Sequence, residues 1–243
     1  MHSISYERAR DVAHAVELGS SPGSKFIGGG TNLLDLYKSG IERPTRLVDV
    51  SRLALNTVEE LPDGGARIGA MASNTQAANH PLVRQRYRVL SEAILNGASA
   101  QLRNMATVGG NICRSYAAAS MVSLAVGLDA TAHVWSPDGT DRDLPVAELV
   151  IGNGINLLAP GEVLRAIDFP AHALRARTSV RKIALAELGR SGAVVTGRVD
   201  DDGAATFGIT AATEWPTVLR YTGLPTRDAL HDDIVSASGY YTD

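Results

Sequence analysis

Apolar residues recur at helical or strand spacing along most of the chain, and these patterns predict both kinds of element. Helical spacing predicts helices over residues 7–18, 32–38, 75–79, 82–97, 118–128 and 144–150. Short apolar runs bounded by turn-forming residues predict strands over residues 25–28, 46–51, 64–73, 130–135, 161–170, 179–184, 193–199 and 205–211. Residues 25–51 therefore read as a strand, a glycine turn, a helix and a second strand.

The pattern changes at residues 171–178, where we place a domain boundary. Strands joined by short connections follow this boundary, and the acidic run from Asp200 to Gly203 is typical of a hairpin turn. The polar tail from Gly223 onward shows no periodicity, so no element is predicted there.

The composition is that of an ordinary soluble protein, and it excludes several classes of function. Of 243 residues, 44% are hydrophobic and 20% are charged. The net charge is −3, the pI is near 6.1, and no run of Lys and Arg appears, which argues against nucleic acid binding. Cys113 is the single cysteine, so this chain alone has no internal disulfide and no cysteine-based metal or iron–sulfur site. Neither a signal peptide nor an apolar run of membrane-spanning length is visible, so we expect a cytoplasmic protein that does not enter a membrane.

Two glycine-rich stretches carry the main candidate chemistry. The first, "FIGGGTN", places Gly28, Gly29 and Gly30 after an apolar run. The second, "TVGGN", places Gly109 and Gly110 between a threonine and an asparagine. Backbone amides in such loops bind phosphate oxygens, and threonine and asparagine side chains add hydrogen bonds. A tight turn is the alternative explanation for either stretch alone, and the presence of two such stretches favours the anion site.

The other candidate motifs give weaker indications. Leu33 stands where a Rossmann fingerprint has its third glycine, and no Gly-Lys-Ser/Thr sequence of a P-loop is present. The aspartates at 200–202 are expected to lie in a solvated turn, and the six histidines show no spacing typical of metal ligands. Arg103 and Arg114 flank the second glycine stretch and either neutralise a phosphate or are surface charges. No GxSxG or HExxH motif of a hydrolase occurs.

Three longer segments together resemble a known family. They are "FIGGGTNLLDLYKSGIERPTRLVDVSRL", "ARIGAMASNTQAANHPLV" and "GASAQLRNMATVGGNICRS". These segments are similar to the FAD-binding (medium) subunit of the molybdenum hydroxylases, a family that includes xanthine dehydrogenase, bacterial aldehyde oxidoreductases, nicotine and ketone dehydrogenases and carbon monoxide dehydrogenase. The similarity covers nearly all of residues 4–220, with both glycine stretches in order.

The resemblance implies an α+β fold with two domains. Residues 1–172 would form a FAD-binding domain of the vanillyl-alcohol-oxidase (PCMH) type, with subdomains of about 1–54 and 55–172. Residues 178–243 would form a small, shortened α+β domain similar to the C-terminal domain of the carbon monoxide dehydrogenase flavoprotein.

The resemblance also implies which residues bind the cofactor. The segment 27–33 matches the first FAD loop of the family, which holds the pyrophosphate, and the segment 107–111 matches the second. An apolar residue near the flavin and adenine is implied at Leu164, and a lysine at the isoalloxazine edge is implied at Lys182. The full implied set is Ile27, Gly28, Gly29, Gly30, Thr31, Asn32, Leu33, Thr107, Gly109, Gly110, Asn111, Arg114, Ser120, Leu164 and Lys182. No catalytic residue and no metal ligand is implied in this chain.

Three departures from the family pattern stand out. Ser120 occupies a position where the family usually has an aspartate that contacts FAD. The cysteine-rich [4Fe-4S] insertion of many aldehyde oxidoreductase relatives is absent, since Arg114 leads directly into an alanine-rich segment. Judged by the same resemblance, the C-terminal domain looks like a shortened version of the one in the family.

The function implied by the resemblance is that of an electron-transfer subunit. Substrate would be oxidised at a molybdopterin centre on a large subunit, and [2Fe-2S] clusters on a small subunit would pass electrons to FAD on this chain. FAD would then reduce NAD+, O2 or a quinone, within a dimer of heterotrimers. Two alternatives stay open: a stand-alone FAD oxidase or reductase of the same fold, and a non-enzymatic scaffold that has lost part of the FAD site.

Overall fold

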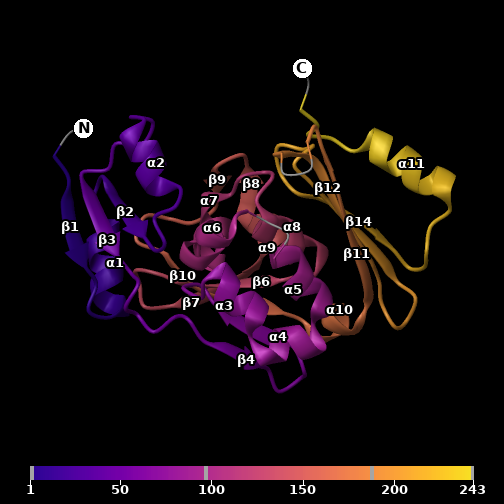
Figure 1. The fold of residues 1–243 in the computed structure, drawn as a ribbon, viewed down its shortest axis with the longest axis horizontal. Helices are drawn as coiled ribbons and strands as arrows, with labels where there is room; N and C mark the ends of the chain where they lie inside the picture. Colours follow the sequence, from indigo (N-terminus) through magenta and orange to yellow (C-terminus); the bar gives the residue numbers. More distant parts are fainter. Residues whose placement is uncertain (1–2, 96–97, 187–188, 242–243) are drawn as a thin grey trace.

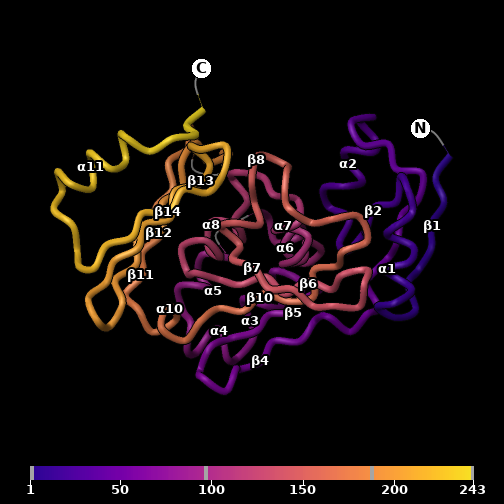
Figure 2. The backbone as a smooth tube through the Cα atoms, turned by 180° about the vertical axis from the view of Figure 1, so that it is seen from behind, coloured from indigo at the N-terminus to yellow at the C-terminus, as the bar shows by residue number. Residues whose placement is uncertain are grey.

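The computed structural model describes residues 3–95, 98–186 and 189–241, which are arranged around three β-sheets (Figure 1). A three-stranded sheet, a five-stranded sheet and a four-stranded sheet follow one another across the molecule, and a two-stranded ribbon completes the set. The view from behind shows the same order from the indigo N-terminal part to the yellow C-terminal part (Figure 2). The chain thus has the α+β fold that the sequence implied.

The N-terminal sheet is parallel. Its spatial order is β1 (Ser5–Arg8), β3 (Arg46–Asp49) and β2 (Ser24–Ile27). Parallel neighbours require crossover connections, and here these contain α1 (Val12–Ser20) and α2 (Leu33–Lys38). The strand–turn–helix–strand unit predicted for residues 25–51 is therefore confirmed.

The helix predicted over residues 7–18 is partly wrong. The first of these residues belong to β1, and α1 begins only after Asp11, whose carboxylate accepts a hydrogen bond from the His14 amide at 2.8 Å. Aspartate is a favoured residue at a helix N-cap. The pairing of β1 with β3 connects segments that are distant in sequence, which apolar spacing alone does not detect.

The middle sheet is antiparallel, and its central strand, β10 (Val163–Phe169), is the last of its five strands in sequence. Its order is β4 (Val58–Glu60), β5 (Ala66–Gly69), β10, β6 (Thr131–Trp135) and β7 (Asp141–Pro145). On one face Ile68, Ala132 and Ile167 belong to the main hydrophobic core. The two edge strands, β4 and β7, were not predicted, because their sequences are largely polar.

Helices cover the core face of this sheet (Figure 1). They are α3 (Asn74–Asn79), α4 (Pro81–Arg86), α5 (Arg88–Leu95), α6 (Ala100–Met105), α7 (Val108–Arg114), α8 (Ser120–Gly127) and α9 (Val146–Leu149). The ribbon of β8 (Val150–Gly152) and β9 (Ile155–Asn156) follows α9. The helix predicted over 82–97 is in fact two helices that break at Tyr87, and its expected end at Gly97 lies outside the described residues.

The C-terminal sheet contains four antiparallel strands in sequence order. They are β11 (Arg177–Ala184), β12 (Ser191–Val199), β13 (Ala205–Thr210) and β14 (Thr217–Tyr221). The first three match the predicted strands, whereas β14 and the terminal helix α11 (Arg227–Ser236) were missed. The predicted turn after β12 is confirmed by a hydrogen bond from the Gly203 amide to the Asp200 carbonyl. Helix α10 (Ala171–Arg175) lies at the expected boundary, and the division into domains stays a prediction.

Candidate functional site

A cleft of about 1,700 Å³ lies between the N-terminal part of the chain, the helices of the middle part and the C-terminal sheet. Its wall combines residues from the loop after β2, from α5 to α8, and from the first two strands of the C-terminal sheet. Most small-molecule pockets have volumes of about 300–1,000 Å³. The cleft is therefore large enough for an extended cofactor.

The first glycine stretch forms one end of this cleft. A side chain at Gly29 would place its Cβ 1.8 Å from the Met105 carbonyl oxygen, so only glycine fits at this position. Gly30 has a φ of +69°, which favours glycine as well. Close backbone contact and a left-handed turn together bend the chain between β2 and α2.

The backbone amides of this loop are open. Within the described part of the chain, no group accepts a hydrogen bond from the amides of residues 28–33, and the Asn32 side chain does not cap α2. These residues all line the cleft. Successive unused amides on a bent loop form an anion-binding site, to which Thr31 and Asn32 can contribute side-chain donors.

The second glycine stretch has a different structure. Gly109 and Gly110 lie in the first turn of α7, where Thr107 is the N-cap and its hydroxyl accepts a hydrogen bond from the Gly110 amide at 3.0 Å. The amides of Val108 and Gly109 donate to carbonyls of the segment after β5, and that of Asn111 donates to the Thr107 carbonyl. This stretch therefore places Thr107, Gly110 and Asn111 at the cleft, while its amides from Val108 to Asn111 all donate to acceptors within the chain.

The two glycine stretches are in contact. A Cβ added at Gly28 would lie 3.3 Å from the Thr107 hydroxyl oxygen, and Thr107 also forms a β-bridge with Ser73. Segments about eighty residues apart in sequence thus build one surface of the cleft.

Arg114 provides positive charge in the cleft. Its guanidinium lies 4.2 Å from the centre of the Tyr116 ring, donates to the Tyr116 hydroxyl at 2.6 Å and lies 4.0 Å from Glu42. Its Nε is buried and has no hydrogen-bond partner among the described residues. Of the two interpretations of this arginine, the structure favours a cleft residue over a surface charge. Arg103 instead donates to the Ala98 carbonyl and does not line the cleft.

The other side of the cleft contains Ser120 and Lys182. Ser120 is the first residue of α8, and the next amide, that of Met121, donates to the Asn111 side chain at 3.0 Å. Lys182 lies on β11, and its ammonium donates to the Gly189 carbonyl at 3.1 Å. Both residues line the cleft.

Two residues of the implied set lie elsewhere. Leu164 is 5% exposed in the hydrophobic core on β10, and Gly109 packs tightly against Ala70. Neither lines the cleft, whereas the rest of the set does.

Several cleft residues were missed by the sequence analysis. Glu42, Thr178, Arg181 and Arg190 line the cleft, but they belong to no motif. Five consecutive residues of β11, from 178 to 182, line the cleft, so the alternation of side chains along a strand would not have singled out Thr178 or Arg181. Cys113 also lies at the cleft, and burial raises the pKa of its thiol to about 12, so it is not a nucleophile at neutral pH.

The residues present fit FAD. The open amides of residues 28–33 match a pyrophosphate, and the unpartnered Nε of Arg114 offers a further donor. The described residues contain no cluster of three or more His, Cys, Asp or Glu side chains suited to a metal ion. Among the same residues, no helix combines the length and apolar character needed to cross a membrane.

Comparison with known proteins gives one family match and several relatives. Residues 2–172 match the family described as FAD binding domain in molybdopterin dehydrogenase. The aldehyde oxidoreductase FAD-binding subunit PaoB of Escherichia coli (strain K12) is 52% identical over 113 residues, which is 46% of this chain and 36% of PaoB. The 6-hydroxypseudooxynicotine dehydrogenase complex subunit alpha of Paenarthrobacter nicotinovorans is 31% identical over 69% of this chain and 57% of that protein. The matched stretch thus spans less than two thirds of either relative.

A solved structure confirms the fold. The carbon monoxide dehydrogenase of Hydrogenophaga pseudoflava that lacks the Mo-pyranopterin moiety contains a chain with a TM-score of 0.88 and 23% identity. The match covers 100% of this chain and 89% of that one. The α+β fold implied by the sequence is the fold of that chain.

Proposed function

Because the chain belongs to the family of FAD-binding domains in molybdopterin dehydrogenases, we propose that it is the FAD-carrying electron-transfer subunit of a molybdenum-containing hydroxylase. The open amides of residues 28–33 are the observation on which this proposal rests most directly. When bound, FAD supplies the redox chemistry, because a flavin can exchange electrons singly or in pairs. The chain's own residues bind and orient the cofactor.

In this proposal, different groups of cleft residues bind different parts of FAD. The amides of residues 28–33, with Thr31 and Asn32, hold the pyrophosphate without a formal positive charge. Arg114 adds one positive charge to this site, and its stacking on Tyr116 fixes the orientation of the guanidinium. The closely packed Gly110 backbone lets the cofactor approach α7.

The C-terminal sheet closes the opposite side. Lys182 lines the cleft, with its ammonium donating to the Gly189 carbonyl, and this is the side chain that we assign to the polar edge of the isoalloxazine ring. Ser120 can donate one hydrogen bond where the family has an aspartate. A neutral hydroxyl at this position adds no negative charge next to the phosphates, so the serine is compatible with FAD binding.

The partners follow from the same proposal. We propose a large molybdopterin subunit, a small subunit with [2Fe-2S] clusters, and an external acceptor such as NAD+, O2 or a quinone. The names of relatives in this family describe FAD-binding subunits, a medium subunit and medium chains of dehydrogenases. A dimer of heterotrimers in the cytoplasm is the assembly we propose.

Co-expression with the neighbouring reading frames tests this proposal. An affinity tag on this chain should recover two partners, with molybdenum, iron and FAD in the same peak. Activity of this chain alone toward an aldehyde or N-heterocycle would support a stand-alone oxidase. Recovery of partners with metal but without any flavin would contradict the proposal and favour a scaffold.

A further inference from the structure

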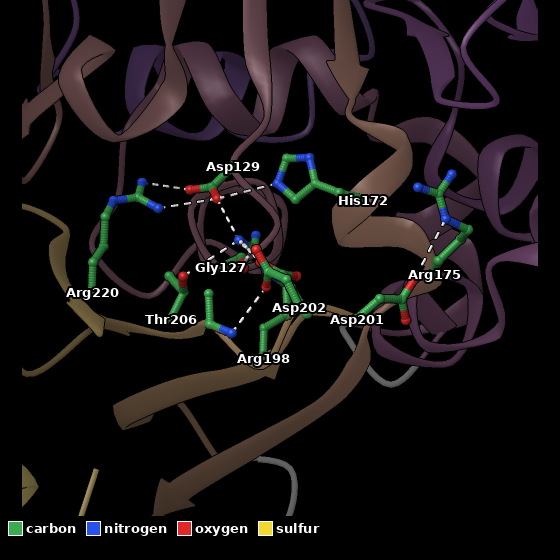
Figure 3. A network of polar contacts seen from close by, with 11 residues as sticks. Gly127, Asp129, His172, Arg175, Arg198, Asp201, Asp202, Thr206 and Arg220 are labelled. Atoms are coloured by element: carbon green, nitrogen blue, oxygen red, sulfur yellow. Dashed lines mark hydrogen bonds and ion pairs between the residues drawn. The ribbon is translucent and has the colours of Figure 1, made fainter. Parts of the chain in front are cut away.

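Arg198, on β12, is a buried cation at the contact between α8 and the C-terminal sheet (Figure 3). Its side chain is 2% exposed. One guanidinium nitrogen, Nη2, donates to Asp129 at 2.6 Å and to the Thr206 hydroxyl at 3.3 Å, and Nε lies 2.8 Å from Asp200. Two carboxylates thus neutralise this charge, and Asp200 is not the purely solvated turn residue that the sequence suggested.

Arg198 also stabilises the end of α8. Its Nη1 donates at 3.3 Å to the carbonyl of Gly127, the last residue of that helix. Asp129 follows two residues later with a φ of +51°, so the chain turns sharply at the position where its carboxylate meets Arg198. A cation at a helix C-terminus stabilises the last carbonyls of the helix. Arg198 therefore fixes the C-terminal end of α8.

The other end of α8 forms part of the cleft. Ser120 and Ser123 line the cleft, and the Met121 amide is tied to Asn111 of α7. A helix of eight residues is about 12 Å long. One short, rigid element thus connects Arg198 with the candidate cofactor site.

The strand that carries Arg198 reaches the cleft as well. Val194 lies four residues earlier on the same face of β12, lines the cleft and pairs with Lys182 of β11. The position of β12 against α8 therefore determines the distance between the side of the cleft that contains Lys182 and the side that contains Ser120.

Helix α8 is packed closely against the C-terminal sheet. A Cβ at Gly127 would lie 2.3 Å from the Thr196 side chain, and the hydroxyl oxygens of Ser123 and Thr210 are 2.6 Å apart. Close-packed interiors transmit displacements instead of absorbing them. A shift of β12 at Arg198 would therefore move the cleft walls.

Arg198 differs in burial from the other charged groups around Asp129. Arg220 donates to both oxygens of Asp129, but its side chain is 58% exposed, and His172 is 51% exposed and 3.8 Å away. Burial alone would raise the pKa of Asp129, but hydrogen bonds from Arg220 and Arg198 outweigh it and lower the pKa below its ordinary value. Asp129 is therefore ionised at neutral pH, and Arg198 is its buried partner.

We propose that Arg198 is a positioning residue for the cofactor: its buried ion pairs hold the C-terminal sheet against α8 and so set the width of the cleft between Ser120 and Lys182. This inference rests on the proposed binding of FAD. It assigns to a residue outside the cleft a quantitative effect on cofactor affinity.

Titration of FAD into purified wild type, Arg198→Met and Arg175→Met tests the inference. Arg175 is a matched control, because this residue of α10 also forms an ion pair with the C-terminal sheet, through Asp201 after β12 at 3.7 Å (Figure 3). Both partners of this pair are exposed. Coupling between separate sites typically changes affinity about 5- to 150-fold. We expect the Kd for FAD to rise by a factor in this range in Arg198→Met, and by less than about twofold in Arg175→Met.

Hydrogen exchange provides the second readout. In Arg198→Met the amides of α8 and β11 should exchange faster, while those of β5, β6 and β10 keep their protection. If Arg198→Met loses protection throughout the middle sheet, Arg198→Lys decides the question, since lysine keeps the charge but not the forked donor geometry. The Kd of Arg198→Lys for FAD should then lie between the wild-type Kd and the range expected for Arg198→Met.

The outcomes separate this inference from the proposed function. A wild type that takes up no FAD contradicts the proposed function itself. A wild type that binds FAD, with Arg198→Met or a folded Arg198→Lys binding it equally well, overturns the role of Arg198 alone. An equal loss of affinity in Arg175→Met would overturn it too, because any ion pair with the C-terminal sheet would then have the same effect.

Discussion

Gly29 and Gly109 show how differently two similar glycine stretches can act. Both stretches contain glycines flanked by threonine and asparagine, and the sequence identified both. The amides around Gly29 are open, whereas those around Gly109 are used by Thr107 and by carbonyls after β5. Which amides stay free depends on acceptors elsewhere in the chain, so sequence patterns alone could not distinguish the loops.

The residues that the resemblance implied as cofactor ligands do not all lie at the cleft. Arg114, Ser120 and Lys182 lie at the cleft. Leu164 lies in the core instead, because the central strand β10 is buried among the residues around it. The role implied for Leu164 stays a prediction.

His133 offers a test at the level of a single residue. On the face of the middle sheet away from the core, its Nε2 lies 2.8 Å from Asp168 and its Nδ1 lies 2.5 Å from Asp143. Arg67 holds Asp168 with two further bonds of 2.7 Å. The hydrogen bond to Asp168 outweighs the opposing effect of burial and raises the pKa of His133 above its ordinary value.

A raised histidine pKa gives a defined pH dependence of stability. The contribution of protonated His133 is fully present below the ordinary histidine pKa of about 6.5 and is lost as the pH rises through the higher value of the folded protein. Urea unfolding should therefore show a larger fall in the free energy of unfolding from about pH 6 to 9 in wild type than in His133→Gln, by on the order of 1 kcal/mol. Parallel pH profiles of the two proteins would contradict this prediction.

At the level of elements, Tyr87 explains the clearest difference between the predicted and observed helices. Apolar positions continue at helical spacing through residues 82–95, so the pattern contains no break. The break occurs because Tyr87 leaves the helical conformation, is 5% exposed and donates its hydroxyl to the Gly64 carbonyl at 2.7 Å. A hydrogen bond to a distant loop determines where the helix ends.

Tyr87→Phe tests this explanation. Removal of the hydroxyl leaves the Gly64 carbonyl without this donor, and such a loss typically costs about 0.5–1.5 kcal/mol. Chemical denaturation should show a decrease of that size in the free energy of unfolding. Tyr241→Phe is the control, since Tyr241 is 45% exposed, and a similar decrease in both variants would contradict the explanation.

Several of the elements that the sequence analysis missed are polar, although β14 is not. Strands β1, β4 and β7 have polar sequences and are held by their neighbours in the sheets. Helix α11 has no buried residue and a low apolar content, so apolar spacing could not reveal it. In the strands predicted from apolar runs, the runs coincide with buried positions, and most of these predictions were correct to within three residues.

The whole molecule forms its candidate site from segments that are far apart in sequence. Residues of the N-terminal loop, of α5 to α8 and of the C-terminal sheet meet in one cleft. The sequence identified the glycine loops and, by resemblance, the family. By resemblance it also placed Lys182 of β11 at the cofactor, but it did not place β12 there, because that arrangement depends on the packing of α8 against the C-terminal sheet.

Equilibrium titration of the purified chain with FAD and with FMN tests the central claim most directly. The open amides of residues 28–33 are matched to a pyrophosphate, which FAD contains and FMN lacks. The account predicts saturable binding of one FAD per chain with flavin fluorescence quenching, at least about tenfold tighter than FMN, a difference of about 1.4 kcal/mol. Gly29→Ala should lose most of this preference, because its Cβ would displace the loop from Met105. Equal affinity for FAD and FMN, or no binding of either, would contradict the account.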